Sequence, residues 1–335
     1  MKYIAVFFLL LIISSCGNDV INNNGNGNPV SDFDIYLSRF IPTTFSIRSY
    51  TIKSDGSNLR LLNDSLYVTS ASYKNKITMA NIDSSGFFCN LLYTANSDGT
   101  NLVKIPRGSY YPVYFILSPN GDKVLFTTDA GNYLCVINID GTGLIQLSDG
   151  IRGTEIVPKF SPDGRLIAFF EAPPNLSTGL YTISTDGSNK KLLKDSIHYS
   201  NNYTLDWSPD GSKIVYQNNI GTLLPAKICT VDTSGTAYNE ITNGQNPSFS
   251  PNGKKITYLA NVNQGIYDLF VMNSDGSGIA NLTNSFSEYD HEGAWSGDGS
   301  KILYHSGSYL VKIYDMDLQL SRILTDSLSG AFWKY

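Results

Sequence analysis

The clearest candidates for acid–base or metal chemistry in this 335-residue sequence are its three histidines, His198, His291 and His305. A neutral imidazole binds divalent cations, and its charge changes near neutral pH. Together with Gln245 or Glu292, the first two histidines could form a metal site. No ligand pair has the close spacing typical of a dedicated zinc site, so we expect neither a bound metal nor another cofactor.

A wider set of aromatic, amide and charged residues lies in the segments between the apolar runs. Aromatic rings next to amides and charges suit a sugar or a peptide end, because stacking and hydrogen bonding then act together. The binding candidates are Tyr110, Tyr111, Arg152, Glu155, His198, Tyr199, Gln245, Asn246, Asp290, His291 and Glu292.

Motifs for covalent catalysis are missing from the sequence. There is no Gly-x-Ser-x-Gly elbow, and no glycine-rich phosphate loop opens a helix. The formal net charge is −5 without any basic cluster, which argues against nucleic acid as a partner. We therefore expect no catalytic residues, and we favour a non-enzymatic protein.

The elements that must position the candidate residues follow from an internal repeat. Seven times, a short apolar run ends in a turn of the Asp-Gly type, and successive turns are 41 to 48 residues apart. A repeat of this length indicates an array of small β-sheets. The turns begin at Asp55, Asp98, Asp140, Asp186, Ser234, Asp275 and Asp317.

A second motif alternates with the first. Each copy has a bulky apolar residue, a Ser-x-Asx-Gly turn and then an alternating strand, which is typical of a hairpin. Each repeat therefore predicts four antiparallel strands, a to d. The five copies are 117–121, 160–164, 207–211, 249–253 and 295–299.

These Ser-x-Asx-Gly copies resemble the WD40-like repeats of the TolB-type β-propeller family over roughly residues 45–325. The resemblance implies an all-β propeller of four-stranded antiparallel blades, because ring closure covers both faces of every sheet. Residues 46–63 would supply a c–d pair, 34–40 a b strand and 331–335 an a strand. Pairing of the two ends would then complete seven blades, with six or eight still open.

The N-terminus is a processing signal. Lys2 precedes an apolar run, and Ile13-Ser-Ser-Cys16 resembles the lipobox of bacterial lipoproteins, which implies cleavage before an acylated Cys16. We expect a signal peptide over 1–15, the lipidated cysteine with a flexible Asn/Gly-rich tether over 16–29, and the propeller over 30–335. Gly17 in place of an aspartate favours the outer membrane.

Two further cysteines occupy a repeated position. Cys135 and Cys229 each lie five residues before a turn, which predicts a small apolar core residue rather than a redox or metal role. In other repeats this position is held by Tyr50, Tyr93, Tyr181 and Phe270.

The predicted topology places the d–a and b–c connections on one face of the ring. The extra length of the longest repeats falls there, in 171–179, 195–202 and 218–225, and the binding candidates line the mouth of the central channel. We expect a lipid-anchored envelope scaffold that binds a protein or an oligosaccharide on this face. The alternative is a polysaccharide lyase or hydrolase acting in the channel, with or without a metal, similar to propeller lyases that use His and Gln ligands.

Overall fold

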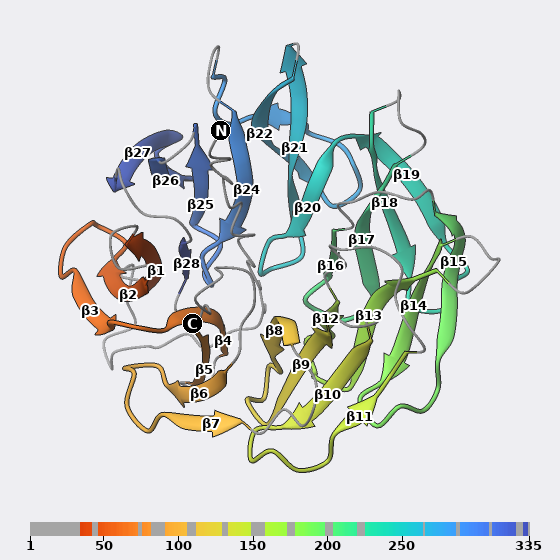
Figure 1. Cartoon of the computed structure of the whole chain (residues 1–335). Coiled ribbons are helices and arrows are strands. Elements are labelled where there is room, and N and C mark those ends of the chain that lie inside the picture. The colour runs from red at the N-terminus through yellow and green to blue at the C-terminus, as the bar shows by residue number, and fades with distance from the viewer. Residues whose placement is uncertain are drawn as a thin grey trace, which may run out of the picture.

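The computed structural model describes 28 β-strands arranged as a ring of seven four-stranded antiparallel sheets (Figure 1). No helix occurs in the ranges that it describes. These ranges are 34–41, 46–72, 76–81, 91–105, 112–128, 133–148, 158–172, 178–197, 204–219, 225–263, 265–285, 289–307, 310–325 and 331–333.

Each sheet is one blade, with its first strand innermost and its last strand on the outside of the ring (Figure 1). Blade 1 consists of β28 (Ala331–Trp333), β1 (Asp34–Ile41), β2 (Ser46–Lys53) and β3 (Arg60–Asn63), and blade 2 consists of β4 (Tyr67–Ser72), β5 (Lys76–Ala80), β6 (Leu92–Asn96) and β7 (Val103–Ile105). Blade 3 consists of β8 (Pro112–Leu117), β9 (Lys123–Thr128), β10 (Leu134–Asn138) and β11 (Ile145–Gln146), and blade 4 consists of β12 (Lys159–Phe160), β13 (Leu166–Glu171), β14 (Thr178–Ser184) and β15 (Lys191–Ile197).

The other three blades follow the same order along the chain. Blade 5 consists of β16 (Leu205–Trp207), β17 (Lys213–Asn218), β18 (Lys227–Asp232) and β19 (Tyr238–Asn243). Blade 6 consists of β20 (Gln245–Phe249), β21 (Lys255–Asn263), β22 (Ile266–Asn273) and β23 (Ala280–Asn281). Blade 7 consists of β24 (Asp290–Trp295), β25 (Lys301–Ser306), β26 (Leu310–Asp315) and β27 (Leu320–Thr325).

Blade 1 is built from both ends of the chain. The C-terminal strand β28 pairs antiparallel with β1, so that Ile35 lies opposite Trp333 and Leu37 opposite Ala331. β1 in turn pairs with β2 over eight residue pairs. The predicted closure by an a strand from the C-terminus and a b strand from the N-terminus is confirmed, and the blade number is seven.

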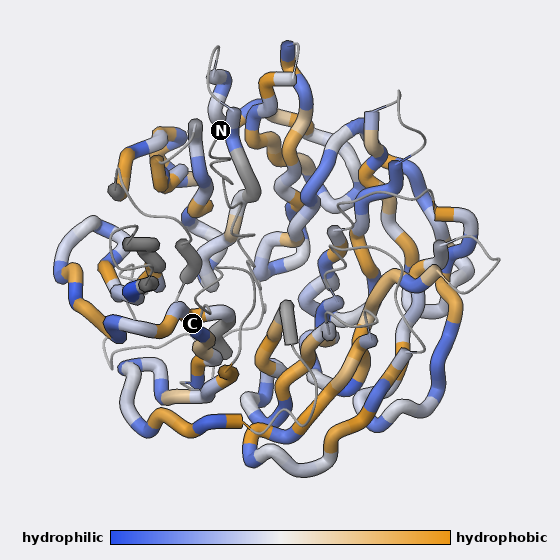
Figure 2. The backbone as a smooth tube through the Cα atoms, in the orientation of Figure 1, coloured by the Kyte–Doolittle hydropathy of each residue, from blue (hydrophilic) through white to orange (hydrophobic). Residues whose placement is uncertain are grey.

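The hydrophobic core lies between neighbouring blades. Between blades 6 and 7, for example, Leu259 and Leu269 pack in one cluster with Trp295 and Tyr304. Because each sheet buries both faces against its neighbours, the b and c strands read as nearly continuous apolar runs. Figure 2 shows this pattern as hydrophobic colour along the inner strands of several blades.

The cysteine prediction is confirmed for the two cysteines that the structure describes. Cys135 and Cys229 are free thiols, and both are fully buried in the interblade clusters. Burial raises the pKa of the Cys135 thiol to about 11, which leaves it protonated and unreactive at neutral pH.

The Ser-x-Asx-Gly motif forms the a–b turn of its blade through local hydrogen bonds. In blade 4, the Ser161 hydroxyl donates to Oδ1 of Asp163 at 2.6 Å and accepts from the backbone N–H of Leu166 at 2.9 Å. Gly164 takes a positive φ of 71°, which only glycine adopts without strain. Equivalent serine contacts recur at Ser208, Ser250 and Ser296.

The Asp-Gly motif forms the c–d turn and also helps to pack the blades. Oδ1 of Asp186 accepts from the Ser188 backbone N–H at 2.9 Å and from its hydroxyl at 2.6 Å, and these bonds lower the pKa of the Asp186 carboxyl. A Cβ on Gly276 would lie 2.6 Å from Cγ2 of Ile241 in the preceding blade. Glycine is therefore needed there both for its backbone angle and for interblade contact.

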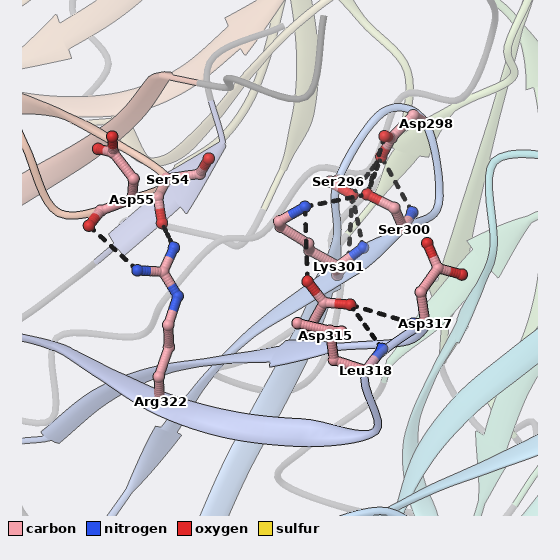
Figure 3. A network of polar contacts seen from close by, with 10 residues as sticks. All are labelled: Ser54, Asp55, Ser296, Asp298, Ser300, Lys301, Asp315, Asp317, Leu318 and Arg322. Atoms are coloured by element: carbon pink, nitrogen blue, oxygen red, sulfur yellow. Dashed lines mark hydrogen bonds and ion pairs between the residues drawn. The ribbon is translucent and has the colours of Figure 1, made fainter. Parts of the chain in front are cut away.

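The junction between blades 7 and 1 uses the same kind of contact as an internal junction. Arg322 on β27 donates to the backbone carbonyls of Ser54 and Asp55 in the β2–β3 turn (Figure 3). Lys191 on β15 likewise donates to the carbonyl of Thr233 in the next c–d turn, at 3.2 Å. The chain ends are therefore joined by the packing that holds the rest of the ring.

Candidate functional site

The candidate site is the end of the ring that carries the d–a and b–c connections. Strand direction alternates within each blade, so the Ser-x-Asx-Gly and Asp-Gly turns share the opposite end, called the turn face below. The other end, where an a strand begins and a b strand finishes, is called the connection face. It contains the described starts of β20 and β24, where Gln245 and Asp290 lie.

The innermost strands of three blades are held together by a buried carboxylate. Asp206 on β16 is 2% exposed, and its Oδ1 lies 3.1 Å from Nζ of Lys159 on β12. Its Oδ2 accepts from the Ser248 hydroxyl and from the backbone N–H of Phe249 on β20, both at 2.9 Å. One side chain therefore connects blades 4, 5 and 6 at the innermost strands.

Two tryptophans of the repeated turn motif add further bonds between innermost strands. The indole N–H of Trp207 donates to the Lys159 carbonyl at 3.2 Å, and that of Trp295 donates to the Ser248 carbonyl at 3.4 Å. In both cases the acceptor lies on the innermost strand of the preceding blade. These bonds tie the innermost strands of neighbouring blades to one another.

An amide and aromatic cluster lies at the connection face where blades 5, 6 and 7 meet. Nε2 of Gln245 donates to the hydroxyl of Tyr289 at 3.3 Å, and the Tyr289 ring packs 5.1 Å from the ring of Tyr267. The backbone N–H of Asn246 donates to Oε1 of Gln217 at 3.2 Å. These side chains are half-buried except Gln217, which is buried, so the cluster is both ordered and partly accessible.

Tyr267, Tyr289 and Gln217 are absent from the sequence-based list of binding candidates. Gln217 directly precedes the predicted b–c loop 218–225, and Tyr289 directly precedes Asp290. Position relative to the repeat would have placed them on this face. Their contact with Gln245 depends on how adjacent blades pack, which the sequence does not give.

Asp290 lies inside the junction of blades 6 and 7 rather than on the surface. Its side chain is fully buried, and neither carboxyl oxygen has a partner at hydrogen-bond geometry. Burial raises the pKa of the Asp290 carboxyl, and the charge of Asp268 adds to this, whereas Thr283, Ser306 and Lys312 act in the opposite direction. In this arrangement Asp290 cannot touch a partner directly.

Lys312, beside the same junction, is the residue whose type departs from the repeat. It holds the repeat position that carries Tyr181 or Phe270 in other blades, and its ammonium group donates to the Ser306 hydroxyl at 3.0 Å. Other repeats have an apolar or aromatic residue in this position. A lysine there indicates, from the sequence alone, that a buried polar group lies nearby.

We expect Asp290→Asn to raise the thermal midpoint at pH 7 to 8 and to leave it unchanged at pH 4 or below. The raised pKa means that the folded protein holds this proton more tightly than the unfolded chain. Stability is therefore lost as the pH rises through the ordinary aspartate value of about 3.9 toward the folded value. Differential scanning fluorimetry across this pH range measures the effect.

The matched control is Asp186→Asn in an exposed turn, where the pKa is lowered and the pH dependence should have the opposite sign. A lower midpoint for Asp290→Asn at pH 7 would instead mean that Asp290 is ionised and held by Lys312.

The other predicted residues are placed only in part. Tyr110, Tyr111, Arg152, Glu155, His198 and Tyr199 lie outside the described residues, as does Cys16 with the predicted leader and tether. His291 and Glu292 follow Asp290 in β24, and only their backbone is described. The structure therefore brings together Gln245 and Asn246 but does not test the larger set.

The insertions are also partly strand. Glu171 ends β13 and is buried, with Oε2 2.5 Å from Nζ of Lys190, and Asp195 lies within β15. Across the described ranges, no group of three or more His, Cys, Asp or Glu side chains could hold a metal ion. The same ranges hold no helix that is long and apolar enough to span a membrane.

Comparison with known proteins bears on the family. No protein-family model matches the chain. The Tol-Pal system protein TolB of Francisella tularensis subsp. mediasiatica (strain FSC147) is 27% identical over 242 residues, which cover 57% of this chain and 55% of that protein. The chain is therefore similar in sequence to TolB over its repeat region. It spans about half the length of the curated relatives that it matches.

Solved structures agree with this fold. The crystal structure of TolB from Acinetobacter baumannii superposes with a TM-score of 0.57 at 14% identity, covering 86% of this chain and 78% of that one. The β-propeller domain of the Trilobed protease from Pyrococcus furiosus gives 0.64 at 9% identity, with 88% and 95% covered. At these identities the likeness concerns the β-propeller fold alone.

Proposed function

We propose that this TolB-type propeller is a non-enzymatic scaffold of the bacterial cell envelope that binds a protein partner on its connection face. The observation that carries the proposal is the 27% identity of its repeat region to proteins named for the Tol-Pal system. The partly accessible cluster of Gln245, Tyr267 and Tyr289 supports the choice of face. Half-buried aromatic rings held by amides are typical of residues that anchor a protein partner.

The proposal extends to how the chain is held in the envelope. Residues 1–15 act as a leader, Cys16 becomes the acylated first residue, 16–29 link it to the propeller over 30–335, and Gly17 directs the chain to the outer membrane. The lipobox-like sequence Ile13-Ser-Ser-Cys16 supports this assignment. Intact-mass measurement of the mature chain should show residue 16 as its start, with added acyl mass that Cys16→Ser abolishes.

The binding proposal is tested by affinity capture from the native envelope, with mass spectrometry of the retained proteins. We expect one specific protein to be retained by the wild-type chain. Its recovery should fall at least tenfold with His198→Ala/Tyr199→Ala, which the predicted topology assigns to the connection face. It should fall equally with Gln245→Ala/Tyr289→Ala, whose side chains are hydrogen-bonded to each other on that face. Arg165→Ala, whose side chain is 86% exposed on the turn face, is the control and should capture normally.

Equal capture by all variants would place the partner elsewhere, provided that their thermal midpoints match that of the wild type. The same variants are also measured on a glycan array. If the wild-type chain retains an oligosaccharide and no protein, the partner on this face is a glycan.

A further inference from the structure

The outer surface of three consecutive blades carries a concentration of exposed apolar side chains. Of the eleven large hydrophobic residues that are exposed in the described ranges, seven lie on the outer strands of blades 7, 1 and 2 or within two residues before them. We call these seven the apolar rim: Leu59, Leu61, Leu102, Val103, Leu318, Leu320 and Ile323. Their exposed fractions run from 44% to 69%, so they take no part in the core.

The strands that carry the apolar rim lie side by side. Arg322 on β27 holds the turn that leads into β3, as Figure 3 shows. A Cβ on Gly99, in the turn before β7, would lie 2.9 Å from Leu62 on β3. The three strands β27, β3 and β7 follow one another along one side of the ring (Figure 1). The seven rim residues are therefore grouped on neighbouring blades at one side of the ring.

Cationic side chains alternate with the apolar ones on these strands. Arg60 lies between Leu59 and Leu61, and Lys104 follows Val103, and both cations are exposed. Exposed leucines interleaved with lysine and arginine are typical of surfaces that rest in the headgroup region of a bilayer. A protein partner with a dry apolar surface would leave these charges unpaired, which favours lipid as the occupant.

The chain enters the propeller next to the same surface. Asp34, the first described residue, starts β1 in blade 1 and pairs with Lys53 beside the turn that precedes Leu59. Cys16 is 18 residues upstream, so even a fully extended connection spans at most roughly 60 Å. An acylated Cys16 would hold the rim at high effective concentration against the membrane.

We propose that the apolar rim is a lipid-contact surface that sets how the anchored propeller lies on the membrane. The proposal rests on the acylation of Cys16 given above, and its occupant is the bilayer that holds the anchor. With the rim on lipid, blades 7, 1 and 2 face the membrane, and the far side of the ring, blades 4 and 5, points away from it. The acyl group supplies attachment, and the rim supplies orientation.

The test is quenching of an introduced tryptophan by brominated lipid, using the full acylated chain in vesicles of phosphatidylethanolamine and phosphatidylglycerol that contain dibrominated phosphatidylcholine. Leu61→Trp places the probe in the rim. Ile279→Trp on blade 6 is the matched control, because the two parent side chains are 50% and 51% exposed. The chain has three tryptophans of its own, Trp207, Trp295 and Trp333, and the quenching of the parent chain is measured separately and subtracted from that of each variant.

We expect the fluorescence added by Leu61→Trp to be quenched at least twofold more than that added by Ile279→Trp. Equal quenching of the two probes in the acylated chain would overturn the rim as the contact surface. An emission shift of Leu61→Trp that depends on protein concentration without lipid would overturn it too, because a second copy of the chain would then occupy the rim.

Intact-mass measurement of the chain distinguishes a wrong rim assignment from absence of acylation at Cys16. A chain without acyl mass contradicts the acylation of Cys16, whereas the quenching ratio reports on the rim however the chain reaches the vesicle. A second test adds Leu320→Ser/Ile323→Ser to the chain that carries Leu61→Trp. The two polar side chains should weaken contact of the rim with lipid and so lower the quenching of the probe.

Discussion

Replacement of Asp206 by alanine is expected to lower the thermal midpoint of the propeller by on the order of 10 °C. Removing one partner of a buried ion pair costs about 3–5 kcal/mol, because the other charge stays behind without compensation. Here the loss strands the ammonium of Lys159 and the backbone N–H of Phe249 together. A free energy of that size corresponds to roughly 2–4 °C of midpoint per kcal/mol in chains of several hundred residues.

The conservative variant separates charge from hydrogen bonding. Asp206→Asn keeps an oxygen for the Phe249 N–H and the Ser248 hydroxyl, so its midpoint should fall less than that of Asp206→Ala. Arg165→Ala removes an exposed ion pair at 3.8 Å and should change the midpoint by less than about 2 °C. If Asp206→Ala were as stable as this control, the buried carboxylate would not hold the three blades together.

Deletion of residues 331–335 is expected to destabilise the ring by about 4 kcal/mol or more. The deletion removes β28, which pairs with β1 at Ile35, Tyr36 and Leu37. Ile35 and Leu37 are fully buried against blade 7 and Tyr36 against blade 2, so opening the ring at this blade exposes them to water. Exposing a buried Ile or Leu side chain costs about 1.5–3 kcal/mol, and the freed edge of β1 invites aggregation. Urea unfolding and size-exclusion chromatography measure the two effects.

The closure itself is tested by restoring the strand in trans. Deletion of residues 334–335 alone leaves β28 in place and should retain most of the stability. A peptide of residues 326–335 added to the chain that lacks 331–335 should raise its midpoint in a saturable way, because it binds only the folded ring. Stability unaffected by the deletion would show that β1 and β28 do not hold the ring closed.

What the sequence determined about this protein is mostly local. The Ser-x-Asx-Gly and Asp-Gly turns depend on contacts within about five residues, such as Ser161 with Leu166 and Asp186 with Ser188. Short-range contacts of this kind are read directly from residue order, and their repetition predicts the period and the four-stranded blade. The shared blade was predictable because the N-terminal segment supplies b, c and d strands without an a strand, and the C-terminal segment supplies a lone a strand.

Other features were decided by the tertiary structure. Asp206 meets Lys159 and Ser248 across 47 and 42 residues, and Asp290 is buried between blades although its neighbours in sequence are polar. The contact of Tyr289 with Gln245 and the grouping of the seven residues of the apolar rim could not be read from the sequence either. Such contacts depend on the number of blades and the angle between them. The repeat count predicts the number of blades, but the packing of one blade on the next is fixed only when the ring closes.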